Sequence, residues 1–592
     1  MNTRKNSKHT PTILILLALG LSIISLFIEQ AGIRNTSVFY ITNIMDFTVL
    51  ILLIWEIVSD FRKSGYPLLY VRNNLVSLSF AAVFIILFAV NKYIIFINEV
   101  SSADQYSLSV IILRNMFLIL KIVTRFKKIA LFVRNLTVHP AQTIIFSFLM
   151  VILVGTLLLM MPFTAVNSRG LPFLDALFTA TSAVCVTGLI VVDTASYFTV
   201  WGQLVVLALI QIGGLGIMVL SFFAIFSIRK KISLEQKFLI SYMVSDEDMS
   251  NLADNLKRIV YITLLIEGIG GLLLFIGFSA RGGVNSGSLF NAVFHSVSAF
   301  CNAGFALFPD SLEGFGSSVY FNSVIAGLII LGGLSFIVIS NILSVKFPFA
   351  AARHDERPWV NERKQTRKKP QISLNTRVVC TYTVILIVAG MLLVYILEHG
   401  NTMKAYSLGR QYLAAFFQSV TLRTAGFNTI PFSGLTTTTY LVMMVFMFIG
   451  GASGSTAGGL KVNTLGVLWG YISSQLRGKE KVLIHNYSIP DERVIKAFLI
   501  LVFAVMVVTV GTVFLSITEA APLEHIMFEV VSAFGTVGLS SGITAHLSGM
   551  GKCVIMLLMF MGRLGPLTIL TALAKHGREV HIEYPQGIVN IG

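Results

Sequence analysis

The chain has 592 residues, of which 55% are hydrophobic and 12% charged, with a formal net charge of +16. Soluble domains carry about twice that share of charged residues, so the composition excludes an ordinary soluble protein. The basic residues gather in alternate loops between long apolar runs, which argues against nucleic-acid binding. This positive-inside bias predicts a multi-pass protein of the cytoplasmic (inner) cell membrane, surrounded by lipid, with both termini in the cytoplasm.

Residues 1–139 predict an N-terminal bundle of four membrane-crossing helices, at 12–28, 38–58, 75–97 and 107–124. Acidic residues lie along the second span (Asp46, Glu56, Asp60) and basic residues along the fourth (Arg114, Lys121, Arg125, Lys128). The basic spacing of 7, 4 and 3 residues (121 − 114, 125 − 121, 128 − 125) lacks the regular arginine repeat of a voltage sensor. A packing or regulatory bundle is the favoured interpretation, and voltage sensing is the alternative.

The rest of the chain predicts eight further spans in four pairs. The pairs are 142–162 with 199–227, 259–279 with 319–345, 378–397 with 437–475, and 495–517 with 550–574. Within each pair, a short apolar stretch and a glycine-centred phrase fill a segment that is too long for a hairpin turn. We therefore expect four pore repeats of helix, short pore helix, re-entrant loop and helix, at 140–230, 255–350, 372–476 and 490–592, the last including the C-terminal tail. The second helix of the third repeat is expected to be interrupted.

The glycine-centred phrase recurs in register. Its four copies are SAVCVTGL (182–189), SAFCNAGF (298–305), VTLRTAGF (420–427) and SAFGTVGL (532–539). Their glycines are separated by 116, 122 and 112 residues (304 − 188, 426 − 304, 538 − 426), and a phenylalanine stands ten residues before each. A second phrase follows in each unit: GGLG (213–216), GGLS (332–335), GGAS (450–453) and GRLG (562–565). This self-similarity predicts four pseudo-symmetric copies of one fold around a single pore.

Four re-entrant loops around one axis suit a cation filter. Irregular backbone at membrane depth is tolerated where it lines a watery path, and inward-facing carbonyls can replace the water around an alkali cation. Glycine keeps side chains out of such a pore, and each preceding pore helix would direct its partly negative C-terminal end at the cation. The predicted K⁺-binding filter residues are Val186, Thr187, Gly188, Asn302, Ala303, Gly304, Thr424, Ala425, Gly426, Thr536, Val537 and Gly538. Close helix packing by small residues is the alternative for these phrases.

A gate is predicted below the filter. The stretch GASGSTAGG interrupts the second helix of the third repeat, and so many small residues cannot form a rigid helix. Its residues are Gly451, Ala452, Ser453, Gly454, Ser455, Thr456, Ala457, Gly458 and Gly459. Arg563 stands where the other repeats have glycine, and an ionisable side chain within a span usually faces a cavity or a partner. We expect a plug loop and a positive barrier; the alternatives are a kinked packing site and a structural anchor.

These phrases, together with GGASGSTAGGLK (450–461) and GRLGPLT (562–568), resemble the membrane subunit of the Trk/Ktr/HKT superfamily of potassium transporters over residues 142–592. The terminal EYPQGIVNIG is similar to the ending of the Ktr branch. The resemblance implies homodimers with one pore per protomer, and a cytoplasmic ring of RCK domains that binds nucleotide and gates the pore. Members have eight or ten spans, so the four N-terminal spans here are largely additional. The third filter phrase, with Val420 and Thr421 where the others have Ser–Ala, is the loosest copy.

The sequence thus predicts an all-α transporter that takes up K⁺, and not an enzyme. It shows no metal-spaced His/Cys cluster, phosphate-binding loop or placed nucleophile, and K⁺ at the filter is the only expected metal, with Na⁺ considered as a coupling ion. Nucleotide is expected only on the regulatory partner. A voltage-gated-type channel would need a sensor in each repeat, and a cation-coupled solute symporter would need buried acidic residues, for which Glu267 and Asp175 are candidates. Asp175 is better interpreted as a pore-helix N-terminal residue, and Cys185, Cys301, Cys380 and Cys553 as packing residues.

Overall fold

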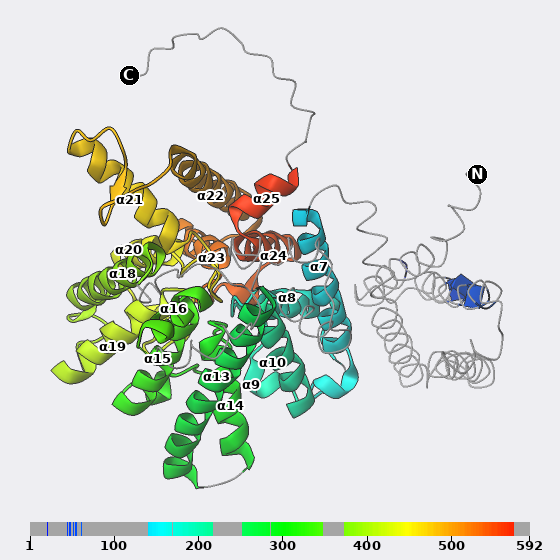
Figure 1. Ribbon diagram of the computed structural model, residues 1–592. Coiled ribbons are helices and arrows are strands. Elements are labelled where there is room, and N and C mark those ends of the chain that lie inside the picture. Colours follow the sequence, from blue (N-terminus) through cyan, green and yellow to red (C-terminus); the bar gives the residue numbers. More distant parts are fainter. Residues whose placement is uncertain are drawn as a thin grey trace, which may run out of the picture.

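The computed structural model describes residues 140–573 except 168–169, 217–251, 284–285 and 347–371, together with isolated positions between 21 and 61. Apart from those positions, the predicted N-terminal spans, with their acidic and basic residues, lie outside the described residues, as does the C-terminal tail. The described part is almost entirely helical, and its helices follow one another around a common centre in chain order (Figure 1).

Each predicted repeat contains a long first helix and a short pore helix. The first helices are α7 (Pro140–Leu159), α13 (Leu252–Gly282), α18 (Leu374–Glu398) and α22 (Asp491–Thr518). The pore helices are α8 (Phe173–Val184), α14 (Ser286–Phe300), α19 (Leu408–Thr421) and α23 (Leu523–Gly535). By length and composition, three helices in the described part (within α13, α18 and α22) could cross a membrane, or five if each of two bent pairs forms one span.

The second helices begin alike in the four repeats. They are α10 (Val200–Leu215), α15 (Val319–Gly333), α20 (Thr437–Phe448) and α24 (Gly549–Leu564). The side chain of the residue before each one (Thr199, Ser318, Thr436 or Ser548) accepts a hydrogen bond from a backbone N–H in the first turn. Such a cap satisfies one of the donors that a helix N-terminus leaves free. The shared cap adds a further mark of the fourfold repeat.

The second helices end differently from what the sequence predicts. An interruption was expected only in the second helix of repeat 3. A bend of 102° separates α15 from α16 (Phe336–Lys346), and one of 95° separates α24 from α25 (Pro566–Leu573). The helix α10 ends at Leu215, before Gly216, whose φ is 80°, and the matching Gly565 has a φ of 82°. In the third repeat, residues 449–461 separate α20 from α21 (Val462–Leu476), as predicted. The prediction of continuous spans at 319–345 and 550–574 was therefore wrong, because the backbone turns at the second phrase in both.

Short elements complete the loops. The 3-10 helices are η1 (Pro162–Thr164), η2 (Glu313–Phe315), η4 (Phe432–Gly434) and η5 (Thr544–His546), and α9 spans Thr194–Tyr197. Two short antiparallel strands, β1 (Leu483–Ile484) and β2 (Tyr487–Ser488), form a hairpin after α21. The hairpin packs on that helix, since the Leu483 N–H donates to Ser474 Oγ at 3.1 Å.

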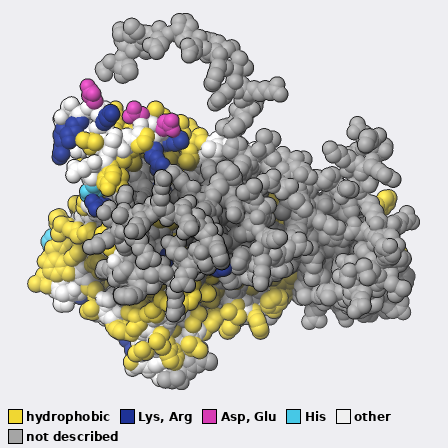
Figure 2. Space-filling model, in the orientation of Figure 1, with side chains coloured by type: hydrophobic (Ala, Val, Ile, Leu, Met, Phe, Trp, Pro, Cys, Tyr) yellow, Lys and Arg dark blue, Asp and Glu magenta, His cyan; other side chains and the backbone are white. Residues whose placement is uncertain are grey.

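The core lies around the pore helices. The largest fully buried side chains are Phe178, Phe294, Phe300, Phe305, Phe417, Phe427, Phe528 and Phe534, all in pore helices or the loops that follow them. The outer helices α13, α18 and α22 instead expose apolar side chains such as Leu272, Val384 and Val502, and hydrophobic side chains cover most of the coloured surface at the lower left of Figure 2. Large exposed apolar areas of this kind mark a surface that contacts lipid.

Candidate ion filter and gate

The four pore helices all end just before a left-handed turn in the backbone. Val186, Asn302, Thr424 and Thr536, two residues before the repeat glycines, have φ values of 57°, 60°, 74° and 52°. The glycines themselves have φ values of 91°, 71°, 79° and 91°. Positive φ is uncommon for residues other than glycine and costs on the order of 1–3 kcal/mol, so it persists where the surroundings enforce it. Its repetition at one register in four loops shows that the four repeats share this backbone geometry.

The repeat glycines form a closed ring. A Cβ built on Gly188 would overlap the Ala303 carbonyl oxygen and lie 3.1 Å from Gly304 Cα. A Cβ built on Gly304 would lie 3.1 Å from Gly426 Cα, and one on Gly426 would lie 3.2 Å from Gly538 Cα. A Cβ on Gly538 would lie 3.0 Å from Gly188 Cα, which closes the ring. The four predicted filter segments therefore meet around one axis in chain order, with repeats 1 and 3 opposite each other and repeats 2 and 4 likewise. Any side chain at these glycines would enter the backbone of the next segment.

Hydroxyl groups at the ends of the pore helices hold the filter backbone. In repeats 1 and 4, Ser182 Oγ and Ser532 Oγ accept from the N–H of Gly188 and Gly538, at 3.0 and 3.2 Å. In repeat 2, Ser298 Oγ donates to the Phe305 carbonyl at 2.7 Å. These serines stand six residues before the glycine.

In repeat 3, whose filter phrase is the loosest copy, a different residue supplies the hydroxyl that holds the filter backbone. Repeat 3 has Val420 at the serine position, but the neighbouring Thr421 Oγ1 donates to the Phe427 carbonyl at 2.9 Å. That contact matches the one from Ser298 to Phe305 in repeat 2. The departure in sequence therefore leaves the hydrogen bond in place.

In repeats 1, 2 and 4 the second phrase brings the second helix against the end of the pore helix. A Cβ built on Gly213, Gly332 or Gly562 would overlap the carbonyl oxygen of Val184, Phe300 or Phe534, respectively. Each of these oxygens belongs to the last turn of the pore helix of the same repeat. Glycine is needed here because the two backbones approach too closely for any side chain.

The segment 449–461 lies directly beneath the filter. Its ends are paired, because the Gly450 N–H donates to the Leu460 carbonyl at 2.8 Å and the Leu460 N–H to the Phe448 carbonyl at 3.1 Å. Between them the chain forms a loop, and a Cβ built on Gly458 would overlap the Thr536 hydroxyl at the entrance of the fourth filter segment.

This loop is fixed to the broken helix of repeat 2. The Ala452 N–H donates to the Gly333 carbonyl at 3.0 Å, and Thr456 Oγ1 donates to the Gly332 carbonyl at 2.9 Å. Within the loop, Ser455 Oγ donates to the Ala452 carbonyl at 2.7 Å, and Lys461 Nζ donates to the Ala457 carbonyl at 2.5 Å. The predicted gate residues 451–459 thus form one hydrogen-bonded unit next to the predicted filter segments.

Arg563 joins this loop to two other repeats. Its guanidinium donates to the Thr456 carbonyl of the loop and to the Gly213 carbonyl at the end of α10, while its backbone belongs to α24. In the other repeats the same register holds Gly214, Gly333 and Gly451. A planar guanidinium can donate to two acceptors at once, which a lysine ammonium does with less geometric definition.

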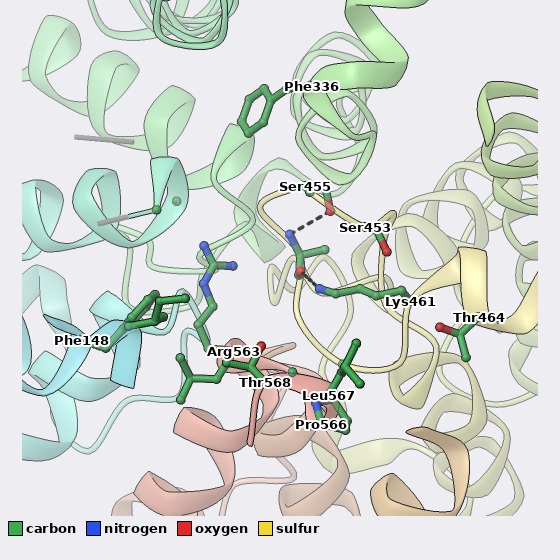
Figure 3. Close-up of a pocket in the computed structure, with 18 of the residues that line it drawn as sticks. Phe148, Phe336, Ser453, Ser455, Lys461, Thr464, Arg563, Pro566, Leu567 and Thr568 are labelled. Carbon is green, nitrogen blue, oxygen red and sulfur yellow. Dashed lines mark hydrogen bonds between the residues drawn. The ribbon is translucent and has the colours of Figure 1, made fainter. Parts of the chain in front are cut away.

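A cavity of about 290 Å³ lies beside the loop, lined by Gly214, Ser453, Ser455, Lys461 and Arg563 among others. Figure 3 shows Arg563 projecting into this space from one side and Lys461 approaching from the loop, with Phe148 and Phe336 at its edges. Two basic side chains therefore face the cavity. A positive charge in a region of low dielectric opposes a cation far more strongly than it would in water.

Other polar residues lie behind the filter. Asp175 is in the first turn of α8, as expected for a pore helix, and its Oδ1 pairs with Lys552 Nζ at 2.6 Å. Glu267 is buried and accepts from Gln211 Nε2 at 3.2 Å, but it does not line the cavity. The four cysteines are free. Glu313 lies on the side of the filter away from the gate loop. Its pKa is raised, mainly by burial and to a lesser extent by the nearby Asp310 carboxylate.

Three buried polar residues were not assigned a role from the sequence. Arg423 is 5% exposed and occupies the register of Cys185 and Cys301, which the sequence shows but does not explain. His295 and Glu529 are fully buried in pore helices, each nine residues before its filter glycine (304 − 295, 538 − 529). Their equal register was the available signal, and their contacts with the loop beyond the filter could not be predicted from it.

Comparison with known proteins gives concordant results. A family model described as TrkH, cation transport protein, matches residues 109–582. The Ktr system potassium uptake protein B of Bacillus subtilis is 38% identical over 455 residues, covering 76% of this chain and 97% of that protein. The potassium/sodium uptake protein NtpJ of Enterococcus hirae is 37% identical over 462 residues, with the same coverage of both. The crystal structure of the potassium transporter TrkH from Vibrio parahaemolyticus superposes with a TM-score of 0.59 at 18% identity, over 85% of this chain and 97% of that one.

Proposed function

This chain belongs to the TrkH cation transport protein family, and from that premise we propose that it takes up K⁺ across the cell membrane through its four-repeat pore. Potassium uptake is the named activity of its Ktr relatives. The observation that carries the proposal is the closed ring of Gly188, Gly304, Gly426 and Gly538. Each of these glycines and the residue two positions before it have positive φ, so the four filter segments have the same local geometry.

Selectivity would come from the backbone of the ring. Carbonyl groups can replace the hydration shell of an alkali cation, and four similar segments surround such an ion evenly. The pore helices that end at the ring add their partly negative C-terminal ends, which favour a cation. In addition, the hydroxyls of Thr187 and Thr536 are buried without a hydrogen-bond partner in the structure, as suits side chains that face an ion path.

The loop 451–459 and Arg563 would form the gate. The loop lies beneath the ring and is held by contacts that can be broken without disturbing the filter, namely those of Ala452 and Thr456 with repeat 2. Arg563 both fastens the loop through Thr456 and places positive charge beside the path. Opening would require the loop to leave Gly332 and Gly333 and the guanidinium to withdraw from the axis.

A regulatory partner would act from the cytoplasmic side. The word "system" in the names of the Ktr relatives implies a complex with a further subunit. We place on that side the α21–α22 connection, in which Arg477, Lys479, Glu480 and Lys481 are exposed. The α21 helix connects this region to the gate loop. A homodimer bound to a nucleotide-binding RCK ring, with both termini in the cytoplasm, is the assembly that we propose.

Ion flux in proteoliposomes tests the function. The purified chain should accumulate K⁺ or Rb⁺ down an inside-negative potential at least about tenfold faster than Na⁺, and protein-free liposomes should not. Adding Na⁺ on the uptake side at constant potential separates the roles of this ion: acceleration would indicate coupling, and inhibition would indicate competition for the filter. Equal uptake of K⁺ and Na⁺, or no uptake of either above liposomes, would contradict the proposal.

A further inference from the structure

In two repeats, a side chain of the pore helix accepts a hydrogen bond from the backbone just beyond the filter glycine. We call this contact a clamp. In repeat 4, Glu529 Oε1 accepts from the N–H of Ser541 at 2.9 Å. In repeat 2, His295 Nε2 accepts from the N–H of Leu307 at 3.3 Å. Each acceptor stands nine residues before its filter glycine, and each donor stands three residues after it (307 − 304, 541 − 538). The same backbone amide is thus held from the same helix position in both repeats.

The contacts of Glu529 use its whole carboxylate. Besides the Ser541 amide, Oε1 accepts from Ser540 Oγ at 2.6 Å, and Oε2 accepts from Thr544 Oγ1 at 2.7 Å. The side chain is fully buried. The Ser541 hydroxyl is a fourth donor, at 3.3 Å from Oε1. An ionised carboxylate is an acceptor only, so four converging donors match the charged form. Bonds to such a charge are about twice as strong as neutral ones, which makes this the firmer of the two clamps.

The contacts of His295 define its tautomer. Its Nδ1 lies 2.7 Å from the Asn291 carbonyl, which can only accept, so Nδ1 carries the proton. Its Nε2 must then be the bare nitrogen that accepts from the Leu307 amide. The ring is fully buried and stacks on Phe308, with centroids 4.9 Å apart. A neutral imidazole therefore does in repeat 2 what the carboxylate does in repeat 4.

The other two repeats lack this clamp. At the same register repeat 1 has Thr179, whose hydroxyl donates to the Asp175 carbonyl within its own helix, and repeat 3 has Phe417. Because the ring runs in chain order, the clamped repeats 2 and 4 stand opposite each other across the axis. Each filter segment is held at its beginning by the pore-helix end, and in repeats 2 and 4 a pore-helix side chain holds its far end as well. In repeat 3 the far end bonds instead to the loop of repeat 2, where the Asn428 N–H donates to Ser311 Oγ at 3.1 Å.

We infer that Glu529 and His295 are positioning residues that set K⁺ over Na⁺ selectivity by fixing the far ends of two opposite filter segments. The inference rests on the proposed function. Carbonyl spacing determines which cation is well coordinated, and the strained segments at Asn302 and Thr536 would relax if their exits were free. Release of either clamp allows the ring to contract around the smaller Na⁺, so selectivity falls while the pore still conducts.

The test measures selectivity separately from rate. Rb⁺ uptake and its competition by Na⁺ are compared in proteoliposomes for the parent, Glu529→Gln, His295→Leu and His295→Gln. Glu529→Gln should lower the K⁺ (Rb⁺) over Na⁺ ratio about tenfold and His295→Leu about threefold, as expected for loss of a charged and a neutral hydrogen bond. In His295→Gln, the amide oxygen can accept from Leu307, and the ratio should stay within about twofold of the parent.

Glu398→Gln is the matched control. Glu398 is also a fully buried glutamate held by several donors, among them Thr402 Oγ1 at 2.8 Å and the Thr436 N–H at 3.2 Å, but it caps the helix α20 away from the filter. It should lower the yield or rate without changing the ratio. If Glu529→Gln does not fold, Thr544→Val removes one donor from the loop side and should shift the ratio in the same direction by about threefold.

The outcomes separate the two proposals. A selective parent whose clamp variants keep its ratio, as Glu398→Gln does, would overturn this inference and leave the proposed function standing. A parent that takes up K⁺ and Na⁺ equally would overturn both. A ratio that falls in Glu529→Gln and His295→Leu, and returns in His295→Gln, supports the positioning role, because a merely structural defect would not be rescued in the ratio.

Discussion

Arg563 donates a hydrogen bond to the carbonyl oxygen of Thr456, and this contact joins the second helix of repeat 4 to the loop that interrupts repeat 3. The same guanidinium also reaches the Gly213 carbonyl, so three of the four repeats meet at one side chain beneath the filter. A residue that both fastens a loop and carries charge can be dissected by substitutions that remove one property at a time.

Arg563→Gly should raise the basal flux of K⁺ and of Na⁺ together, because both the tether and the charge are removed. Arg563→Lys keeps the charge and loses the two-acceptor geometry, so it should give an intermediate flux. Flux per folded protein, measured in proteoliposomes, should rank parent, Arg563→Lys, Arg563→Gly in increasing order. Lys552→Gln removes a cation from the other end of the same helix, where it pairs with Asp175, and should not increase flux. A fall in flux for both Arg563 variants would mark the residue as an anchor of the fold.

Deleting Ala452–Gly458 should also raise basal flux. The deletion removes Ala452 and Thr456, which bond to Gly333 and Gly332, and leaves every predicted filter residue in the chain. A milder variant, Thr456→Val, removes the hydroxyl bond to Gly332 and should raise flux less. Thr509→Val is its control, since Thr509 bonds only to Val505 within its own lipid-facing helix. A deleted protein that folds and conducts no more than the parent would rule out a plug.

Thr421 tests whether repeat 3 replaces the missing serine. Thr421→Ser keeps the hydroxyl bond to Phe427, whereas Thr421→Val leaves a buried carbonyl without its donor, a loss of about 1–3 kcal/mol of stability. Thermal unfolding in detergent should show a lower midpoint for the valine variant only. Thr383→Val is the matched control, because Thr383 is buried and its hydroxyl has no partner in the structure. Equal midpoints for Thr421→Val and the parent would remove the support assigned to Thr421.

The features that recur in all four repeats could be predicted from the sequence. Features that depend on one contact within one repeat could not. The registered glycines identified four pore helices and their loops, because each repeat must solve the same backbone problem. The bends at 334–335 and at Gly565 were missed, since apolar residues continue through them and only the approach of a pore-helix end, seen at Gly332 and Gly562, forces the chain to turn. The N-terminal bundle and the roles of the site residues stay predictions.

The glycine ring gives the most specific prediction for the filter. Serine at any of the four positions introduces a Cβ at positive φ, which costs about 1–2 kcal/mol, and pushes it against the next segment. Gly304 is the least crowded, with its nearest backbone atom, the Ala425 oxygen, 2.8 Å from the added Cβ; at Gly188, Gly426 and Gly538 the Cβ would overlap a carbonyl oxygen. Gly304→Ser should therefore fold, bind K⁺ more weakly and admit more Na⁺, and the other three should show lower folded yield as well.

The control for this series is Gly327→Ser in α15, where an added Cβ meets nothing within 4 Å. It should match the parent in yield, in Rb⁺ uptake and in competition by Na⁺. Because Gly327 and Gly304 belong to the same repeat, a difference between them reports position on the ring and not tolerance of repeat 2 to serine. If all four ring variants folded and kept the K⁺ over Na⁺ ratio of the parent, the ring could not be the filter, and close packing would account for the repeated glycines.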